Sequence, residues 1–229
     1  MKILVTGGNG FIGSRTLGEL YKRGYEIRCL LRANSNRERI AQIPFETSLG
    51  DIREREGLVR AAQGCDAIVH MACVSSWAQI REQADQLGEI VVEGTRNVLE
   101  AARINKVSRV VYVSSCAAVN ASETREVFTE KTAFTLSRSS LKYSIAKHRA
   151  EEVVRDYVHA FDLNAVIVNP SEVYGANDKG LITSGNLVEL LRNAPTFVCS
   201  GGTSVAHVDD VARGICLALE RGRKGESTF

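Results

Sequence analysis

The sequence predicts an α/β fold built on a doubly wound parallel sheet. Short apolar segments alternate with longer segments of helical periodicity through most of the 229 residues. Several apolar segments, such as 109–114 (RVVYVS), are hydrophobic without alternation, as strands covered on both faces usually are. Glycines spaced three apart follow the first apolar segment, where a strand would turn into a helix. These three observations favour one sheet with helices on both faces.

Each element follows from a local pattern. Residues 11–23 place apolar side chains on one helical face, and Gly24 ends the segment. The alternation of strand and helix lapses near residue 174, and one more amphipathic helix follows it. The expected strands are 2–6, 26–31, a short segment at 45–49, 66–71, 109–114 and 164–168. The expected helices are 11–23, 53–63, 79–104, 139–160 and 208–220.

The composition is that of an ordinary globular protein. Net charge is +2 and 44% of the residues are hydrophobic, so nothing favours a nucleic-acid surface. We find no apolar run of about 20 residues that would span a membrane, and no signal-peptide pattern. The six cysteines form no C-x-x-C pair, and the four histidines lack metal-ligand spacing. We therefore predict a cytoplasmic protein with reduced thiols, no metal, no nucleic acid and no membrane partner.

The stretch KILVTGGNGFIG (2–13) predicts a phosphate cradle. After the first strand of such a sheet, Gly7 allows a tight turn, Gly10 admits a pyrophosphate and Gly13 lets the helix pack closely. A purely structural turn is the alternative, because glycine turns are common. The glycine stretch lies between a strand and a helix, and this position favours the phosphate cradle. It therefore predicts a Rossmann-type NAD(P)-binding domain over residues 1–174. The lapse of alternation near 174 suggests a second, small part over residues 175–229, which we expect to be a partial substrate-binding lobe.

The residue after the second strand discriminates between the two nicotinamide dinucleotides. An acidic residue there would bind the ribose 2′-hydroxyl of NAD, but this sequence has Arg32, which suits the 2′-phosphate of NADP. We therefore expect NADP, with NAD as the alternative; a solvated basic loop is the non-functional interpretation. Asp51, in the Asp51-Ile52 pair after the third apolar segment, suits a cap on the next helix.

Tyr143 and Lys147 are four residues apart in a helical segment and so share one face. A lysine ammonium favours the phenolate and would lower the tyrosine pKa, which suits proton transfer to or from a substrate oxygen. The strand before this helix ends in Ser114 and Ser115, at the sheet edge where ligands bind. The alternatives are a surface tyrosine, a solvated lysine and ordinary polar residues at a strand end.

Together these motifs resemble the extended branch of the short-chain dehydrogenase/reductase superfamily, the NAD-dependent epimerase/dehydratase family. The spacing T-G-x-x-G-F-I-G is typical of that branch, and HMAC (70–73), VVEGT (91–95), NPSEVYG (169–175) and HVDDVA (207–212) resemble further family segments. The most similar group that we recognise contains dihydroflavonol 4-reductase-like proteins and hopanoid-associated sugar epimerases. The resemblance implies Ser115, Tyr143 and Lys147 as the catalytic set. It implies cofactor contacts at Gly7, Gly10, Phe11, Ile12, Gly13, Arg32, Asp51, Ile52, Ala72, Tyr143, Lys147, Pro170 and Val173.

Several positions depart from the family pattern. Val91 replaces the usual asparagine, Cys73 replaces an alanine, and Asn169 replaces an arginine common before the proline. The chain ends at GESTF, where relatives continue. His207 resembles a catalytic histidine, but we expect it to anchor the helix that follows.

Three functions fit these observations. The favoured one is an NADP(H)-dependent oxidoreductase that interconverts a hydroxyl and a carbonyl on a small molecule. The second is a nucleotide-sugar epimerase or dehydratase that retains NAD, and the third is a non-catalytic NAD(P) sensor. By analogy with relatives, we expect a homodimer through helices 79–104 and 139–160.

Overall fold

The computed structural model confirms the α/β fold with a parallel seven-stranded sheet. It describes residues 1–74, 80, 82–124, 126–138, 140–178, 183, 185, 188, 191–192 and 202–228. The strand order is β3-β2-β1-β4-β5-β6-β9, and every pair is parallel. The strands are β1 (Lys2–Thr6), β2 (Glu26–Leu31), β3 (Glu46–Leu49), β4 (Ala67–His70), β5 (Arg109–Val113), β6 (Ala165–Val168) and β9 (Ser227–Thr228).

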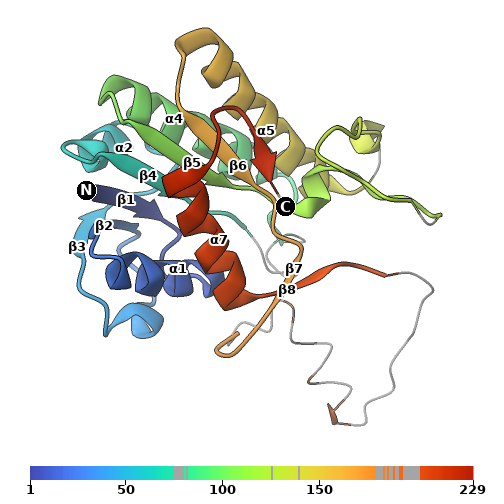
Figure 1. Ribbon diagram of the computed structural model, residues 1–229, viewed down its shortest axis with the longest axis horizontal. Coiled ribbons are helices and arrows are strands. Elements are labelled where there is room, and N and C mark those ends of the chain that lie inside the picture. The colour runs from blue at the N-terminus through green and yellow to red at the C-terminus, as the bar shows by residue number, and fades with distance from the viewer. Residues whose placement is uncertain are drawn as a thin grey trace.

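Helices cover both faces of the sheet. On one face, α1 (Phe11–Lys22) and α7 (Val208–Arg221) pack against each other (Figure 1). On the other face lie α2 (Arg55–Ala62), α4 (Gly94–Ile104) and α5 (Lys142–Phe161). Side chains alternate between the two faces: Leu4 points to the second face and its neighbours Ile3 and Val5 to the first.

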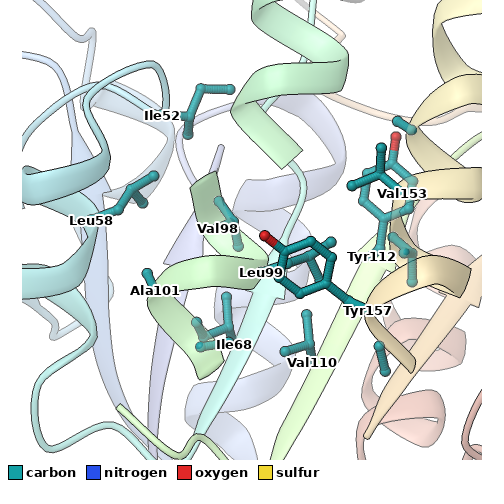
Figure 2. Packing of buried hydrophobic residues seen from close by; sticks show 14 of the residues in the cluster. Ile52, Leu58, Ile68, Val98, Leu99, Ala101, Val110, Tyr112, Val153 and Tyr157 are labelled. Carbon is teal, nitrogen blue, oxygen red and sulfur yellow. The ribbon is translucent and has the colours of Figure 1, made fainter. Parts of the chain in front are cut away.

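Figure 2 shows the core on the second face, where aliphatic side chains from the strands meet those of the three helices. Tyr112 and Tyr157 add two aromatic rings to this core. Burial on both faces explains why the strands read as continuous apolar runs rather than as alternating ones. The crossover helices therefore hold the sheet between two hydrophobic layers, and its carboxyl edge is left for ligands.

Two predicted helices differ from expectation. In the segment predicted as a helix over 79–104, residues 80 and 82 are helical, turns follow at 83–86, and the chain takes a π-helical path over Gly88–Glu93 before the regular helix α4; residues 79 and 81 lie outside the described part. The helix predicted over 139–160 begins at Lys142, and residue 139 also lies outside the described part. A wider π turn changes the side-chain phase, which periodicity of the sequence does not reveal.

The end of the chain returns to the sheet. α7 packs on α1, and β9 pairs with β6, aligning Ile167 with Ser227. The two-stranded ribbon of β7 (Glu172–Tyr174) and β8 (Val205–His207) leads into α7. α7 and β9 therefore pack with the sheet, within the residues 175–229 that the sequence assigned to a partial substrate-binding lobe. The boundary at 174 stays a prediction, because most of 179–201 lies outside the described residues.

Candidate active site

A cleft of about 1020 Å³ runs along the carboxyl ends of the strands. This is the edge where open α/β sheets bind ligands. The structure brings every sequence-predicted site residue to this one cleft. Its lining includes Gly7, Gly10, Phe11, Ile12, Gly13, Arg32, Asp51, Ile52, Ala72, Ser115, Tyr143, Lys147, Pro170 and Val173.

The glycine loop leaves no room for side chains on its inner side. Gly7 has a φ of +74°, and a Cβ there would lie 2.6 Å from the backbone nitrogen of Ala72. A Cβ at Gly13 would collide with the carbonyl oxygen of Gly7. Gly10 precedes α1, whose first turn carries no acidic side chain. The loop and the helix N-terminus therefore form a cradle that fits a dinucleotide pyrophosphate.

Near β2 and β3, the charged residues Arg32, Asp51 and Arg53 line the cleft. Arg32 is exposed and lines the cleft, and its backbone N–H donates to Ser35 Oγ at 3.1 Å. The Asp51 carboxylate accepts hydrogen bonds from the backbone and guanidinium of Arg53 at 2.9 to 3.1 Å. Arg53 lowers the pKa of Asp51, and Arg32 adds a smaller effect in the same direction.

Asp51 does not cap the following helix, so that alternative is wrong. Helix α2 begins at Arg55 with Glu54 at its cap position. The Asp51 side chain instead closes a turn with the N–H of Arg53, two residues on. This leaves Asp51 at the cleft wall, where a ligand hydroxyl can reach it.

Lys147 is buried beneath the cleft, with 2% of its surface exposed. Its Nζ donates to the carbonyl oxygen of Val113 at 3.0 Å and lies 5.2 Å from the centre of the Tyr112 ring. Burial acts to lower the pKa of Lys147, but its neighbours Cys73, Tyr112 and Tyr143 outweigh burial and raise it. Lys147 therefore carries its proton at neutral pH.

Tyr143 lies one helical turn before Lys147 and is partly exposed to the cleft. Burial of its hydroxyl raises the pKa of Tyr143, whereas Lys147 and, more weakly, Ser115 act to lower it. The predicted effect of Lys147 on the Tyr143 pKa is thus present, but desolvation is larger and the pKa is raised overall. In this state Tyr143 is a phenol, which is the form that donates a proton.

A buried polar network holds the loop that carries Ser115. Asn169 Nδ2 donates to the carbonyl oxygen of Ser115 at 3.1 Å and to Glu151 Oε1 at 2.6 Å. Glu151 also pairs with Arg155 at 2.8 Å, one turn along α5. Ser115 Oγ accepts the N–H of Ala117 at 3.2 Å. The asparagine that departs from the family pattern therefore positions the Ser115 backbone.

His70 fixes the strand end before Ala72. Its Nδ1 lies 2.7 Å from Thr6 Oγ1 and its Nε2 lies 3.2 Å from Thr95 Oγ1. Thr6 Oγ1 also accepts the N–H of Ala72 at 3.3 Å. Burial and the charge of Lys147 lower the pKa of His70 to about 3. This histidine is therefore neutral and links β1, β4 and α4.

Some lining residues were not among the predicted set. Asn9, Ser35, Arg53, Cys73, Cys116 and Glu172 also line the cleft, and so does Ser114, which the sequence placed with Ser115 at the strand end. Their proximity to predicted residues in the sequence was the available signal. His207 caps α7 by accepting the N–H of Asp209 at 3.3 Å, so its expected structural role is confirmed. Among the described residues, no group of three His, Cys, Asp or Glu is arranged to hold a metal ion.

A doubly wound sheet with this cradle and cleft defines a Rossmann-type protein of the extended short-chain dehydrogenase/reductase superfamily. More narrowly, the chain belongs to the NAD dependent epimerase/dehydratase family, whose sequence profile matches residues 3–228. The sequence-based recognition of the family is therefore confirmed, and its relatives carry the names of reductases, dehydrogenases and epimerases.

Two curated relatives and two solved structures illustrate the similarity. A 4-hydroxy-2-methyl-3-oxo-4-farnesyl-3,4-dihydroquinoline-1-oxide ketoreductase of Stigmatella aurantiaca is 30% identical, over 100% of this chain and 67% of its own. A putative dihydroflavonol 4-reductase of Synechocystis is 33% identical, over 96% and 63%. The chain thus spans about two thirds of the length of these relatives.

Among solved structures, gox2253 is 33% identical with a TM-score of 0.91, covering 98% of this chain and 68% of its own. DesIV of Streptomyces venezuelae, a dTDP-glucose 4,6-dehydratase with NAD and TYD bound, is 29% identical with a TM-score of 0.85, covering 99% and 74%. A family member of this fold therefore binds NAD.

Proposed function

We propose that this protein is an NADP(H)-dependent oxidoreductase that interconverts a hydroxyl and a carbonyl group on a small molecule. The observation that carries the proposal is the single cleft shared by the glycine cradle, Ser115, Tyr143 and Lys147. The curated relatives named ketoreductase and dihydroflavonol 4-reductase support a reductase.

The bound dinucleotide would supply or accept the hydride. In the reducing direction, Tyr143 donates its phenolic proton to the substrate carbonyl oxygen, and Ser115 Oγ holds that oxygen by a hydrogen bond. The ammonium of Lys147 stabilises the phenolate that remains, and it can also bind a ribose hydroxyl. Tyr143 begins this step as the protonated phenol, and the charge of Lys147 acts to lower its pKa.

Arg32 supports NADP as the cofactor. It lines the cleft, and no carboxylate stands at its place after β2. A guanidinium binds a phosphate by charge-assisted hydrogen bonds, whereas its hydrogen bond to the neutral ribose hydroxyl of NAD is weaker. Asp51 and Ile52 would then hold the adenosine.

A nucleotide-sugar epimerase or dehydratase with retained NAD is the second candidate. The similar structure of DesIV with NAD and TYD bound favours it. A non-catalytic NAD(P) sensor would need no Tyr143 chemistry. We further propose a cytoplasmic homodimer through helices 79–104 and 139–160. Among the described residues, no helix is long and apolar enough to cross a membrane.

The test combines cofactor binding with turnover. NADPH and NADH are titrated separately into the wild type and Arg32→Ala, and NADPH oxidation is followed with a panel of ketones and aldehydes. We expect NADPH to bind more tightly, and Arg32→Ala to weaken NADPH by roughly tenfold or more while sparing NADH. The NADP assignment would be contradicted by tighter binding of NADH than of NADPH, or by NAD that stays tightly bound in the purified protein. It would also be contradicted if Arg32→Ala bound NADPH as tightly as the wild type does.

Tyr143→Phe tests the chemistry with a matched change. It removes one hydroxyl and keeps the ring, so we expect NADPH binding to persist and turnover to fall by about 10²-fold or more. An unchanged rate would refute the assignment of Tyr143 as the proton donor. Wild-type binding without turnover of any carbonyl would favour the sensor.

A further inference from the structure

Three buried side-chain atoms in the described part of the chain have no hydrogen-bond partner: Tyr112 OH, Ser114 Oγ and Asn169 Oδ1. Tyr112 and Asn169 do not line the cleft, whereas Ser114 does. Ser114 has only 6% of its surface exposed, and its neighbour Ser115 already has a partner for its hydroxyl. Ser114 is thus the one of these three residues that contributes to the cleft lining.

An unpartnered buried hydroxyl is unfavourable, because folding removes its water and supplies nothing in return. Here the backbone cannot shift to relieve it, since the N–H of Ser114 donates to the carbonyl oxygen of Val168 at 2.7 Å. Ser114 is therefore held in place at the end of β5 with one unused donor and acceptor. A ligand that enters the cleft is the natural source of the missing partner.

The sheet order identifies which part of a dinucleotide would reach this hydroxyl. The glycine cradle follows β1, Arg32 follows β2 on one side, and Ser114 follows β5 on the other side, beyond β4. A dinucleotide with its pyrophosphate on the cradle and its adenosine toward Arg32 must direct its second nucleoside toward β4 and β5.

The register of the neighbouring strands shows which residues lie beside Ser114. His70 of β4 aligns with Tyr112, and Tyr112 aligns with Ile167 of β6. Two residues further along, Ser114 falls between Ala72 and Asn169. Ala72 and Pro170, which follow β4 and β6, both line the cleft.

We propose that the Ser114 hydroxyl is a cofactor-binding group that hydrogen-bonds the nicotinamide nucleoside, a carboxamide or ribose hydroxyl, and is distinct in role from Ser115. This inference rests on the dinucleotide site of the proposed function. Ser114 contributes to cofactor affinity, and Ser115 contributes to the reacting substrate oxygen.

The experiment compares ligands that do and do not carry the nicotinamide nucleoside. The dissociation constants of NADPH and of 2′,5′-ADP are measured for the wild type, Ser114→Ala, Ser114→Cys and Ser115→Ala. If the wild type prefers NADH, then NADH and 5′-ADP replace them. We expect Ser114→Ala to weaken the dinucleotide by roughly tenfold and to leave the ADP fragment within about twofold. Ser114→Cys keeps a side chain of similar size but carries a poorer hydrogen-bond donor. Its dissociation constant for the dinucleotide should lie between those of the wild type and Ser114→Ala.

Two controls distinguish this role from damage to the fold. The unliganded Ser114→Ala protein should be at least as stable to unfolding as the wild type, because it loses an unsatisfied buried hydroxyl. Ser115→Ala should bind NADPH as the wild type does. An unchanged dinucleotide affinity in Ser114→Ala, or an equal loss for the dinucleotide and the ADP fragment, would overturn the inference. A wild type that binds neither NADPH nor NADH would instead overturn the proposed function itself.

Discussion

The two faces of the sheet are built from the same strands but carry different chemistry. The face under α1 and α7 is aliphatic, and its buried titratable groups include the thiols Cys29 and Cys216. Burial raises the pKa of Cys29 to about 11 and that of Cys216 to about 12, so both stay neutral. The face under α4 and α5 buries the imidazole of His70, the ammonium of Lys147 and the carboxylate of Glu151.

This difference follows from the two-residue period of a strand. Alternate side chains of β5 go to opposite faces: Val111 and Val113 to one, Val110 and Tyr112 to the other. One face can then be packed for stability, while the other tolerates buried polar groups that serve the cleft. We expect substitutions on the first face to change stability alone, and substitutions on the second to change activity or pH dependence.

The largest expected effect is that of Lys147→Met. It removes the charge next to Tyr143 and keeps most of the side-chain volume, so turnover should fall by about 10² to 10⁴-fold. The free energy of unfolding should change by only about 1 kcal/mol, because loss of the bond to Val113 and loss of a buried charge offset each other. Chemical denaturation and steady-state rates check both. A loss of stability with normal turnover would break the comparison.

Leu219→Ala makes the converse change on the other face. Leu219 is 4% exposed in the core between α7 and the sheet, so truncation should cost about 3 kcal/mol in unfolding free energy. The dissociation constant for NADPH and the turnover of folded protein should stay at wild-type values. Urea unfolding and cofactor titration measure the two quantities. If cofactor affinity fell as steeply as stability, the two faces would not be independent.

A smaller effect is expected from His70, and it depends on pH. Its pKa is about 3 in the folded chain and about 6.5 when unfolded, so the unfolded state binds the extra proton between these values. Stability is fully present above about pH 6.5 and is lost as pH falls, by about 2 kcal/mol at pH 5. His70→Gln should flatten this slope. Unfolding free energies measured from pH 7 to pH 5 test it; parallel slopes for both proteins would contradict it.

The sequence determined the elements that local pattern encodes. Apolar runs located β1, β2, β4, β5 and β6 to within a residue or two, and helical periodicity located α1 and α7. The glycine spacing and the Tyr143 and Lys147 pair identified the residues that the structure collects in one cleft. These signals are short in range, since each depends on a turn, a cap or a helix face.

Only the tertiary structure decided what long-range contacts control. β9 has only two residues and forms by pairing with the edge of β6. A strand this short has no periodicity in the sequence that could predict it. The pKa of Tyr143 rises because the surrounding fold buries it, although its sequence neighbour Lys147 acts in the opposite direction. The orphaned hydroxyl of Ser114 also appears only when the cleft is assembled. Burial and desolvation depend on residues far apart in the chain, so the fold decides which polar groups are left for a ligand.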